Sequence, residues 1–148
     1  MNIIETMRTL LLEFPKINEV CNHISVDFTD DTEENYGLSS TGDTLLKEDI
    51  LGNETRQHNF ILYAVFQSVT DYDRMNNSGT LLELQQWLET QADNGIPVMA
   101  EIAGETFEGE IESITPSNGM LYAIPNENNL DLVRYQLQIS AIYKIYKE

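Results

Sequence analysis

The last segment of the chain is the feature that most constrains its fold. Between Val133 and Ile145 every second residue is apolar or aromatic, and most residues between them are polar or charged. Because side chains alternate between the two faces of a strand, this pattern predicts a long β-strand with one buried face and one exposed face. Such a strand requires a sheet, and the apolar face of that sheet requires a covering layer.

A central strand is predicted earlier in the chain. From Phe60 to Phe66 both alternating rows of side chains are apolar, which is typical of a strand buried on two sides. Gly52 and Asn53, a few residues before it, tolerate the positive φ angles of a tight turn. We therefore expect a β-hairpin with arms at residues 44–51 and 55–68.

Two helices are predicted to form the covering layer. Residues 3–14 carry apolar side chains at helical spacing, and Pro15 ends this helix because proline cannot donate to the helical ladder. A second helix is expected to follow the segment 76–79, which supplies capping residues, and to close before Gly95. Its apolar stripe comprises Leu81, Leu84, Leu88 and Ala92.

The remaining elements complete the expected order. Alternating residues predict a strand at 22–28, and a polar, acidic stretch at 29–41 predicts an exposed loop. Residues 107–115 and 119–124 read as one interrupted strand or as two short ones. We expect a single α+β domain over residues 1–148, in the order α-β-β-β-α-β-β. Two helices would cover one face of a mainly antiparallel sheet, with a protruding hairpin.

The charge of the chain excludes some classes of function. Eight Lys and Arg residues stand against 25 Asp and Glu residues, which gives a net charge of −17, and no basic residue lies from Met75 to Val133. Nucleic-acid binding needs clustered cations, and anionic membrane surfaces also attract cations, so both kinds of partner are disfavoured. No apolar run is long enough to cross a membrane, and the N-terminus lacks the features of a signal peptide. A simpler explanation of the negative charge is that it keeps the protein soluble.

The sequence gives little support for catalysis or metal binding. A single cysteine, Cys21, excludes disulfides within the chain, and with only two histidines it excludes an all-Cys/His zinc site. Cys21 and His23 have the spacing to face the same way, but no third group orients them as a nucleophile and its base. Nucleotide-binding and zinc-protease motifs are absent from the sequence. We therefore expect no enzyme activity and no cofactor.

Two acidic segments are candidates for chemistry that have simpler explanations. One cluster comprises Asp27, Asp30, Asp31, Glu33 and Glu34. It could take a divalent cation, but it lacks the rhythm of a calcium-binding loop and is more typical of a solvated surface. Asp71 and Asp73 before Arg74 could be paired catalytic carboxylates, and they fit better as an ion pair at a helix entry. We expect no metal site.

The outer part of the hairpin is apolar although no predicted helix lies near it in sequence. Its apolar residues are Leu45, Leu46, Ile50 and Leu51. Long β arms of this kind find their cover on a neighbouring subunit, or else fold back over their own sheet. Both interpretations remain open at this point.

Several segments together resemble a family of small prophage proteins. They are an R-Q-x-x-F strand at 56–60, an N-S-G helix entry at 77–79, a W-L-E helix end at 87–89 and a final strand from Arg134 to Tyr143. The family is encoded in the head–tail module of siphophages and prophages of Gram-positive bacteria. Its members are called minor capsid proteins and are tail-terminator-like. Residues 96–132 have no counterpart in this resemblance.

The resemblance implies a tail-terminator fold and a homo-oligomeric ring, usually a hexamer, that caps the tail tube and joins it to the head. It implies no catalysis, a location in the virion after assembly in the host cytoplasm, and passage of DNA through the ring without specific binding. The partners would be the tail tube and head-completion proteins. The expected subunit contacts are Leu45, Leu46, Ile50, Leu51 and Arg56. The alternatives are another neck or head-completion protein, or a monomeric acidic binding module such as a nucleic-acid mimic.

Overall fold

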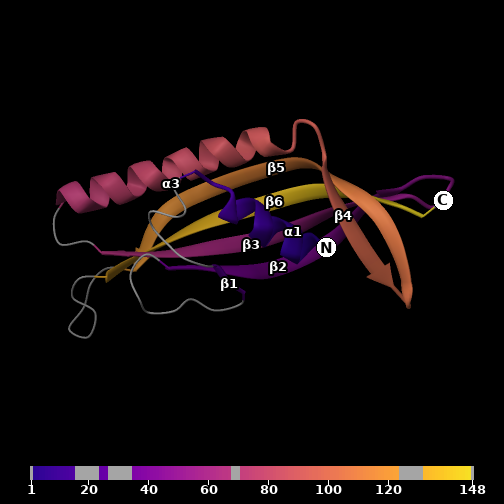
Figure 1. Ribbon diagram of the computed structural model, residues 1–148, viewed down its shortest axis with the longest axis horizontal. Helices are drawn as coiled ribbons and strands as arrows, with labels where there is room; N and C mark the ends of the chain where they lie inside the picture. The colour runs from indigo at the N-terminus through magenta and orange to yellow at the C-terminus, as the bar shows by residue number, and fades with distance from the viewer. Residues whose placement is uncertain (1, 16–23, 27–34, 68–70, 124–131, 148) are drawn as a thin grey trace.

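The computed structural model describes residues 2–15, 24–26, 35–67, 71–123 and 132–147, and the fold is an α+β sheet with two helices (Figure 1). The helices are α1 (Ile3–Leu12) and α3 (Asp71–Gln91). The strands are β1 (Ile24–Val26), β2 (Asn35–Glu48), β3 (Glu54–Gln67), β4 (Ile96–Ile102), β5 (Glu105–Ala123) and β6 (Leu132–Tyr146).

The strands form one six-stranded sheet in the order β1-β2-β3-β6-β5-β4. β1 pairs with β2 in parallel over three residues, and every other neighbouring pair is antiparallel. The strand with both faces apolar, β3, lies between β2 and β6, as the sequence predicts for a central strand. The sequence's expectation of a mainly antiparallel α+β sheet is confirmed.

Both helices pack on one face of this sheet. α1 begins at an N-cap, Asn2, whose side-chain oxygen accepts from the N–H of Glu5 at 2.8 Å. The ring of Phe14, just after α1, meets Trp87 of α3 with 5.5 Å between centroids, so the two helices share one core. The sheet contributes alternate residues to that core. From β6 they are Tyr135, Leu137, Ile139, Ala141, Tyr143 and Ile145.

The other face of the sheet is not covered by a described helix. It holds a hollow of about 480 Å³ lined mainly by uncharged polar side chains. These are Thr41, Gln57, Asn59, Ser117, Gln138 and Ser140, with Ile61 beside them. The alternation predicted for β6 therefore separates an apolar, helix-covered face from a polar one.

The structure adds a strand that the sequence did not predict. β4 pairs with β5 along its whole length and forms one edge of the sheet, so the order becomes α-β-β-β-α-β-β-β. Pro97 made this segment a poor candidate for a strand, because proline lacks the N–H that a sheet ladder needs. An edge strand accommodates it, since one row of its backbone groups does not pair with a described strand.

Two element boundaries differ from those the sequence predicts. β2 begins at Asn35, so residues 35–41 form a strand and not the second half of a loop. α3 begins at Asp71, and the predicted cap at 76–79 lies inside the helix, where weak local propensity is overridden by the rest of the fold. Of the two alternatives for residues 107–124, the structure shows the single interrupted strand: β5 runs from Glu105 to Ala123, with a register shift between Ser117 and Met120.

Candidate functional site

The β2–β3 hairpin carries the residues that the sequence predicts as subunit contacts. Leu45 and Leu46 are 46% and 47% exposed, Leu51 is 59% exposed, and Ile50 is fully exposed at 102%. The alternative in which the arm folds over its own sheet and covers these side chains is wrong for the isolated chain.

Asp49 holds the tip of this turn. Its Oδ1 accepts from the backbone N–H groups of Leu51 and Asn53, each at 2.9 Å, and its Oδ2 accepts from the Asn53 side chain at 3.1 Å. Gly52 has a φ of +89°, which a glycine adopts without strain. Desolvation acts to raise the pKa of the Asp49 carboxyl, but the hydrogen bonds from Asn53 and Leu51 outweigh it and lower the pKa. Ile50 and Leu51 therefore lie on a turn of fixed geometry.

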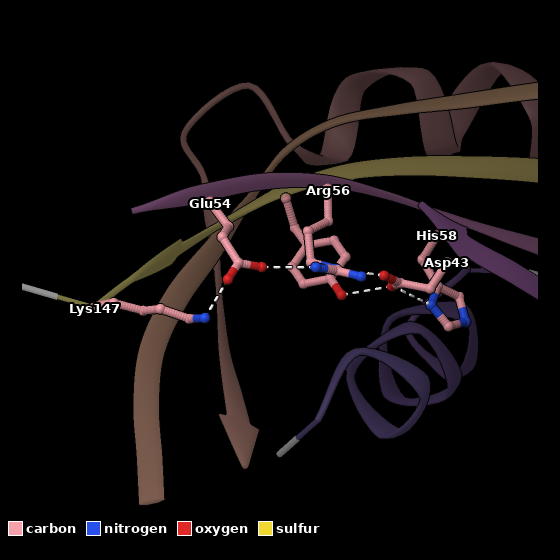
Figure 2. Close-up of polar contacts among 6 residues, drawn as sticks. Asp43, Glu54, Arg56, His58 and Lys147 are labelled. Carbon is pink, nitrogen blue, oxygen red and sulfur yellow. Dashed lines mark hydrogen bonds and ion pairs between the residues drawn. The ribbon is translucent and has the colours of Figure 1, made fainter. Parts of the chain in front are cut away.

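A row of charged side chains braces the base of the hairpin (Figure 2). Arg56 Nε donates to Asp43 Oδ1 at 2.5 Å, and Arg56 Nη1 donates to Glu54 Oε1 at 2.6 Å. Lys147, after the end of β6, donates to the other oxygen of Glu54. The row thus links β2, β3 and the C-terminal end of β6. Arg56, expected as a subunit contact, is occupied in joining strands of its own subunit.

Asp43 is the centre of a second set of contacts. Its Oδ2 accepts from the Tyr143 hydroxyl at 2.6 Å and lies 2.8 Å from His58 Nδ1. The other ring nitrogen, Nε2, lies 2.9 Å from Ser40 Oγ. With Asp43 ionised, His58 donates from Nδ1, and in the neutral ring Nε2 then accepts the serine hydroxyl.

The ionisation of these groups follows from their surroundings. Burial acts to raise the pKa of Asp43, but hydrogen bonds from Tyr143, Arg56 and His58 lower it below its ordinary value of 3.8. The pKa of Glu54 is lowered mainly by the hydrogen bond from Lys147. Burial and the bond to Asp43 raise the pKa of Tyr143. The carboxylates are therefore charged and the phenol neutral at pH 7.

The contacts of Ser40, His58 and Asp43 have the order of a hydrolase triad. The surroundings fit a structural role better. Asp43 is shared with Arg56 and Tyr143, and neither the hollow on the polar face of the sheet nor the groove described below is lined by Ser40 or His58. Ser40 lies within a paired strand, next to a register shift, and not on a sharp strand-to-helix turn. The contacts give each ring nitrogen of the buried His58 a hydrogen-bond partner, and they hold the β2–β3 hairpin in place.

A groove of about 360 Å³ lies beside the charged row. It is lined by Glu54, Arg56, Tyr143, Ile145 and Lys147, together with Ile102 from the end of β4. The groove therefore brings the last residue of the edge strand close to the base of the hairpin. Its lining carries two cations and one carboxylate, and the contacts above already pair both cations with carboxylates.

The sequence did not single out this network, although one signal for it was present. Glu54, Arg56 and His58 occupy every second position of β3, on the same face as Phe60 and Leu62. When side chains on one face of a strand change from apolar to polar, that part of the strand extends beyond the hydrophobic core. Its polar side chains are then expected to be paired with other polar groups. The partners Tyr143 and Lys147 lie some ninety residues or more away in the chain, beyond the reach of local patterns.

The other sequence candidates do not add to this site. Cys21, His23 and the acidic cluster at 27–34 lie outside the described residues, and α3 includes Asp71, Asp73 and Arg74 in its first turn. Within the described ranges no three His, Cys, Asp or Glu side chains are grouped to hold a metal ion. No described helix is both long and apolar enough to cross a membrane.

No protein-family model matches this chain, and no curated protein matches it.

Proposed function

We propose that this chain is a non-enzymatic structural protein of a phage or prophage head–tail module. In this proposal it acts as a tail terminator, a ring that caps the tail tube and joins it to the head. Its partners are further copies of itself, the tail tube and head-completion proteins. It assembles in the host cytoplasm and ends in the virion, with DNA passing through the ring without specific binding.

The exposed apolar tip of the β2–β3 hairpin carries the proposal. Its four large aliphatic side chains lie on a turn fixed by Asp49 and on an arm braced by the Arg56 row. Burying such side chains is worth roughly 1.5–3 kcal/mol each. An arm that is held rigid and keeps them in water is suited to burying them against another subunit, because little ordering entropy remains to be lost on assembly.

The charge of the chain agrees with a channel for DNA. At −17 per chain, a ring of several copies presents a strongly negative field to a polyanion. Described strands β4 and β5 carry acidic residues and no Lys or Arg. Such a surface repels phosphate and leaves a passing duplex free to slide.

Native mass at high protein concentration tests the proposal, with and without magnesium to screen the acidic surfaces. We expect a closed oligomer near the mass of a hexamer of the 16.9 kDa chain. Magnesium should favour it, because closing the ring brings like charges together. A chain that is monomeric under both conditions contradicts self-assembly as its function.

A second function, an acidic module that occupies a basic partner, is favoured by the β4–β5 hairpin. Five glutamates lie along it, at positions 101, 105, 108, 110 and 112. This function predicts a monomer that binds a cationic protein with strong salt dependence. The same mass measurement separates the two functions, since an acidic mimic has no need of self-association.

A further inference from the structure

The side chain of Asn53 connects the turn at the hairpin tip to the residue that follows β6. Its Oδ1 accepts from the backbone N–H of Lys147 at 2.8 Å, and its Nδ2 donates to Asp49 Oδ2 at 3.1 Å. The paired register of β3 and β6 starts at Glu54 and Ile145. Asn53 therefore extends the contact between these two strands with its side chain, and it joins that contact to the turn.

The bond from Lys147 fixes the direction in which the Asn53 amide points. The oxygen and the nitrogen of an amide lie in one plane on opposite sides of its axis, so holding the oxygen also orients the N–H groups. Asn53 is only 9% exposed, which limits the access of water to either bond. The same Asp49 carboxylate accepts from the backbone N–H groups of Leu51 and Asn53 through its other oxygen. The position of Lys147 therefore acts on the whole turn.

The turn depends on such polar contacts because packing does not hold it. Ile50 is fully exposed, and Leu51 is more than half exposed. The backbone adds two bonds, from Asp49 N–H to the carbonyl of Asn53 and from Gly52 N–H to the carbonyl of Asp49, at 3.0 and 3.1 Å. A segment held by few contacts, with its apolar side chains in water, opens at a low cost in free energy. Losing one polar contact should therefore loosen the tip.

Lys147 is itself held by both strands that flank β6. Its ammonium group donates to Glu54 on β3, whose other carboxylate oxygen accepts from Arg56 (Figure 2). The same ammonium group lies 5.8 Å from the ring centroid of Phe107 on β5, within the range of a cation–π contact. Lys147 thus occupies its place only where β3 and β5 lie on either side of β6.

β6 joins the two halves of the sheet. In the strand order β1-β2-β3-β6-β5-β4, it is the strand through which β1, β2 and β3 connect to β5 and β4. The hairpin of β2 and β3 forms from neighbouring residues, whereas β6 comes from much later in the chain and must close a long loop. Lys147 reaches Asn53 only after β6 has paired along β3 as far as Ile145.

We infer that the Lys147–Asn53 bond controls assembly, because it fixes the turn that carries Ile50 and Leu51 only once β6 has joined the sheet. This inference rests on the proposed ring and adds a control to its assembly. A chain without β6 in place keeps a loose tip, and ordering that tip on contact with another subunit costs free energy and weakens the contact. Incompletely folded chains are thereby kept out of the ring.

Two substitutions at one position isolate this bond. Lys147→Pro removes the backbone N–H together with the ammonium group, whereas Lys147→Ala removes only the ammonium group and is the matched control. Hydrogen exchange, measured by NMR at a concentration where the chain is monomeric, reports on the turn directly. Exchange of the Leu51 and Asn53 amides should be roughly fivefold faster in Lys147→Pro than in Lys147→Ala, which corresponds to the loss of one hydrogen bond.

A substitution at the other end of the bond checks that Asn53 makes the connection. Asn53→Asp keeps an oxygen that can accept from Lys147, but it removes the N–H donor and places a second carboxylate beside Asp49. Exchange of the Leu51 amide should be faster than in the natural chain, because the two carboxylates repel each other. Gln57→Glu adds the same charge on the polar face of β3, so it is the control and should leave this exchange unchanged.

Native mass over a concentration series measures the effect on assembly. The concentration at half assembly should be higher for Lys147→Pro than for Lys147→Ala by a factor of at least about five, because the cost of ordering the tip adds to each contact. Circular dichroism of each variant checks that the fold is retained.

The outcomes separate this inference from the proposed function. Faster exchange together with weaker assembly in Lys147→Pro supports both. Equal exchange in the two Lys147 variants, or a ring that forms equally well from both, overturns the inference and leaves the ring standing. A natural chain that never assembles overturns the proposed function, and with it the role of the bond in assembly.

Discussion

Tyr143 and Asp43, one hundred residues apart in the chain, are joined by a hydrogen bond of 2.6 Å from the phenol to the carboxylate. This bond ties β6 to β2 across the intervening β3, on the same face of the sheet as the helices. Because Asp43 also contacts Arg56 and His58, the bond completes the bracing of the hairpin at its base.

Removing this hydroxyl should cost stability. Tyr143→Phe keeps the ring and leaves Asp43 with one donor fewer, and a hydrogen bond to a charged group is worth about 1.5–3 kcal/mol. We expect a loss of about 1–2 kcal/mol in the free energy of unfolding, since Asp43 is partly exposed. Urea denaturation measures it. Tyr146→Phe, which removes an exposed bond to Glu110, is the control and should change stability by less than about 0.5 kcal/mol.

The network should make part of the stability depend on pH. The folded-state pKa of Asp43 lies below its ordinary value of 3.8, and that of Glu54 lies below 4.5. Their contribution is therefore complete above those ordinary values and is lost as the pH falls through the lower folded-state values. We expect the stability difference between the natural chain and an Asp43→Asn variant to be constant near pH 7 and to shrink below about pH 4. A difference that grows on acidification contradicts the assigned contacts.

The exposed tip should be required for assembly and dispensable for folding. Replacing Leu46 and Ile50 together by glutamate places charge where the proposed ring needs apolar contact, and in the single chain Ile50 is fully exposed and Leu46 about half exposed. We expect the oligomer to disappear in native mass spectra while the circular dichroism spectrum is unchanged. Leu82→Glu, on α3, should leave the oligomer intact. Survival of the ring in the double variant would remove the hairpin from the interface.

Ser40 should behave as a structural hydroxyl. Ser40→Ala removes one partner of His58 and should cost about 0.5–1.5 kcal/mol in the free energy of unfolding. A fluorophosphonate probe, which modifies activated serines, should leave the mass of the intact protein unchanged. Stoichiometric labelling that the Ser40→Ala variant abolishes would instead establish an activated nucleophile.

Alanine substitutions at Gly109 and Gly79 should change the stability of the fold in opposite directions. A Cβ at Gly109 would lie 2.1 Å from the carbonyl oxygen of Lys144, a backbone atom of the paired strand, so Gly109→Ala should destabilise the sheet by at least about 2 kcal/mol. A Cβ at Gly79 meets nothing within 4 Å inside α3, so Gly79→Ala should stabilise the helix by about 0.5–1 kcal/mol. Thermal unfolding of both variants checks the opposite signs.

Elements with strong periodicity were predictable from the sequence. The helix at α1 and the alternation of β6 follow from patterns that the core enforces residue by residue. The start of β2 was not predictable, because Gly37, Ser39 and Ser40 are poor strand formers whose pairing comes from β3 and β1. β4 was missed because Pro97 argues against a strand unless the strand is known to lie at an edge.

The candidate site was predictable only in part. The apolar residues of the hairpin tip were found because nothing near them in sequence could cover them, and the structure shows them exposed. The charged row could not be found in the same way. It depends on Tyr143 and Lys147, which lie at the end of the chain and come next to β3 only because β6 pairs with β3 in the sheet.

The register of β2 against β3 shifts twice, between Ser40 and Gly42 and between Leu45 and Lys47. Each shift bends and twists the arm, so its open edge is not the flat, regular template on which strands stack into amyloid fibrils. In the proposed ring, a subunit that has not yet met its neighbours is thereby protected against aggregation. We expect deletion of one residue at a shift to straighten the arm and to raise its tendency to form fibrils.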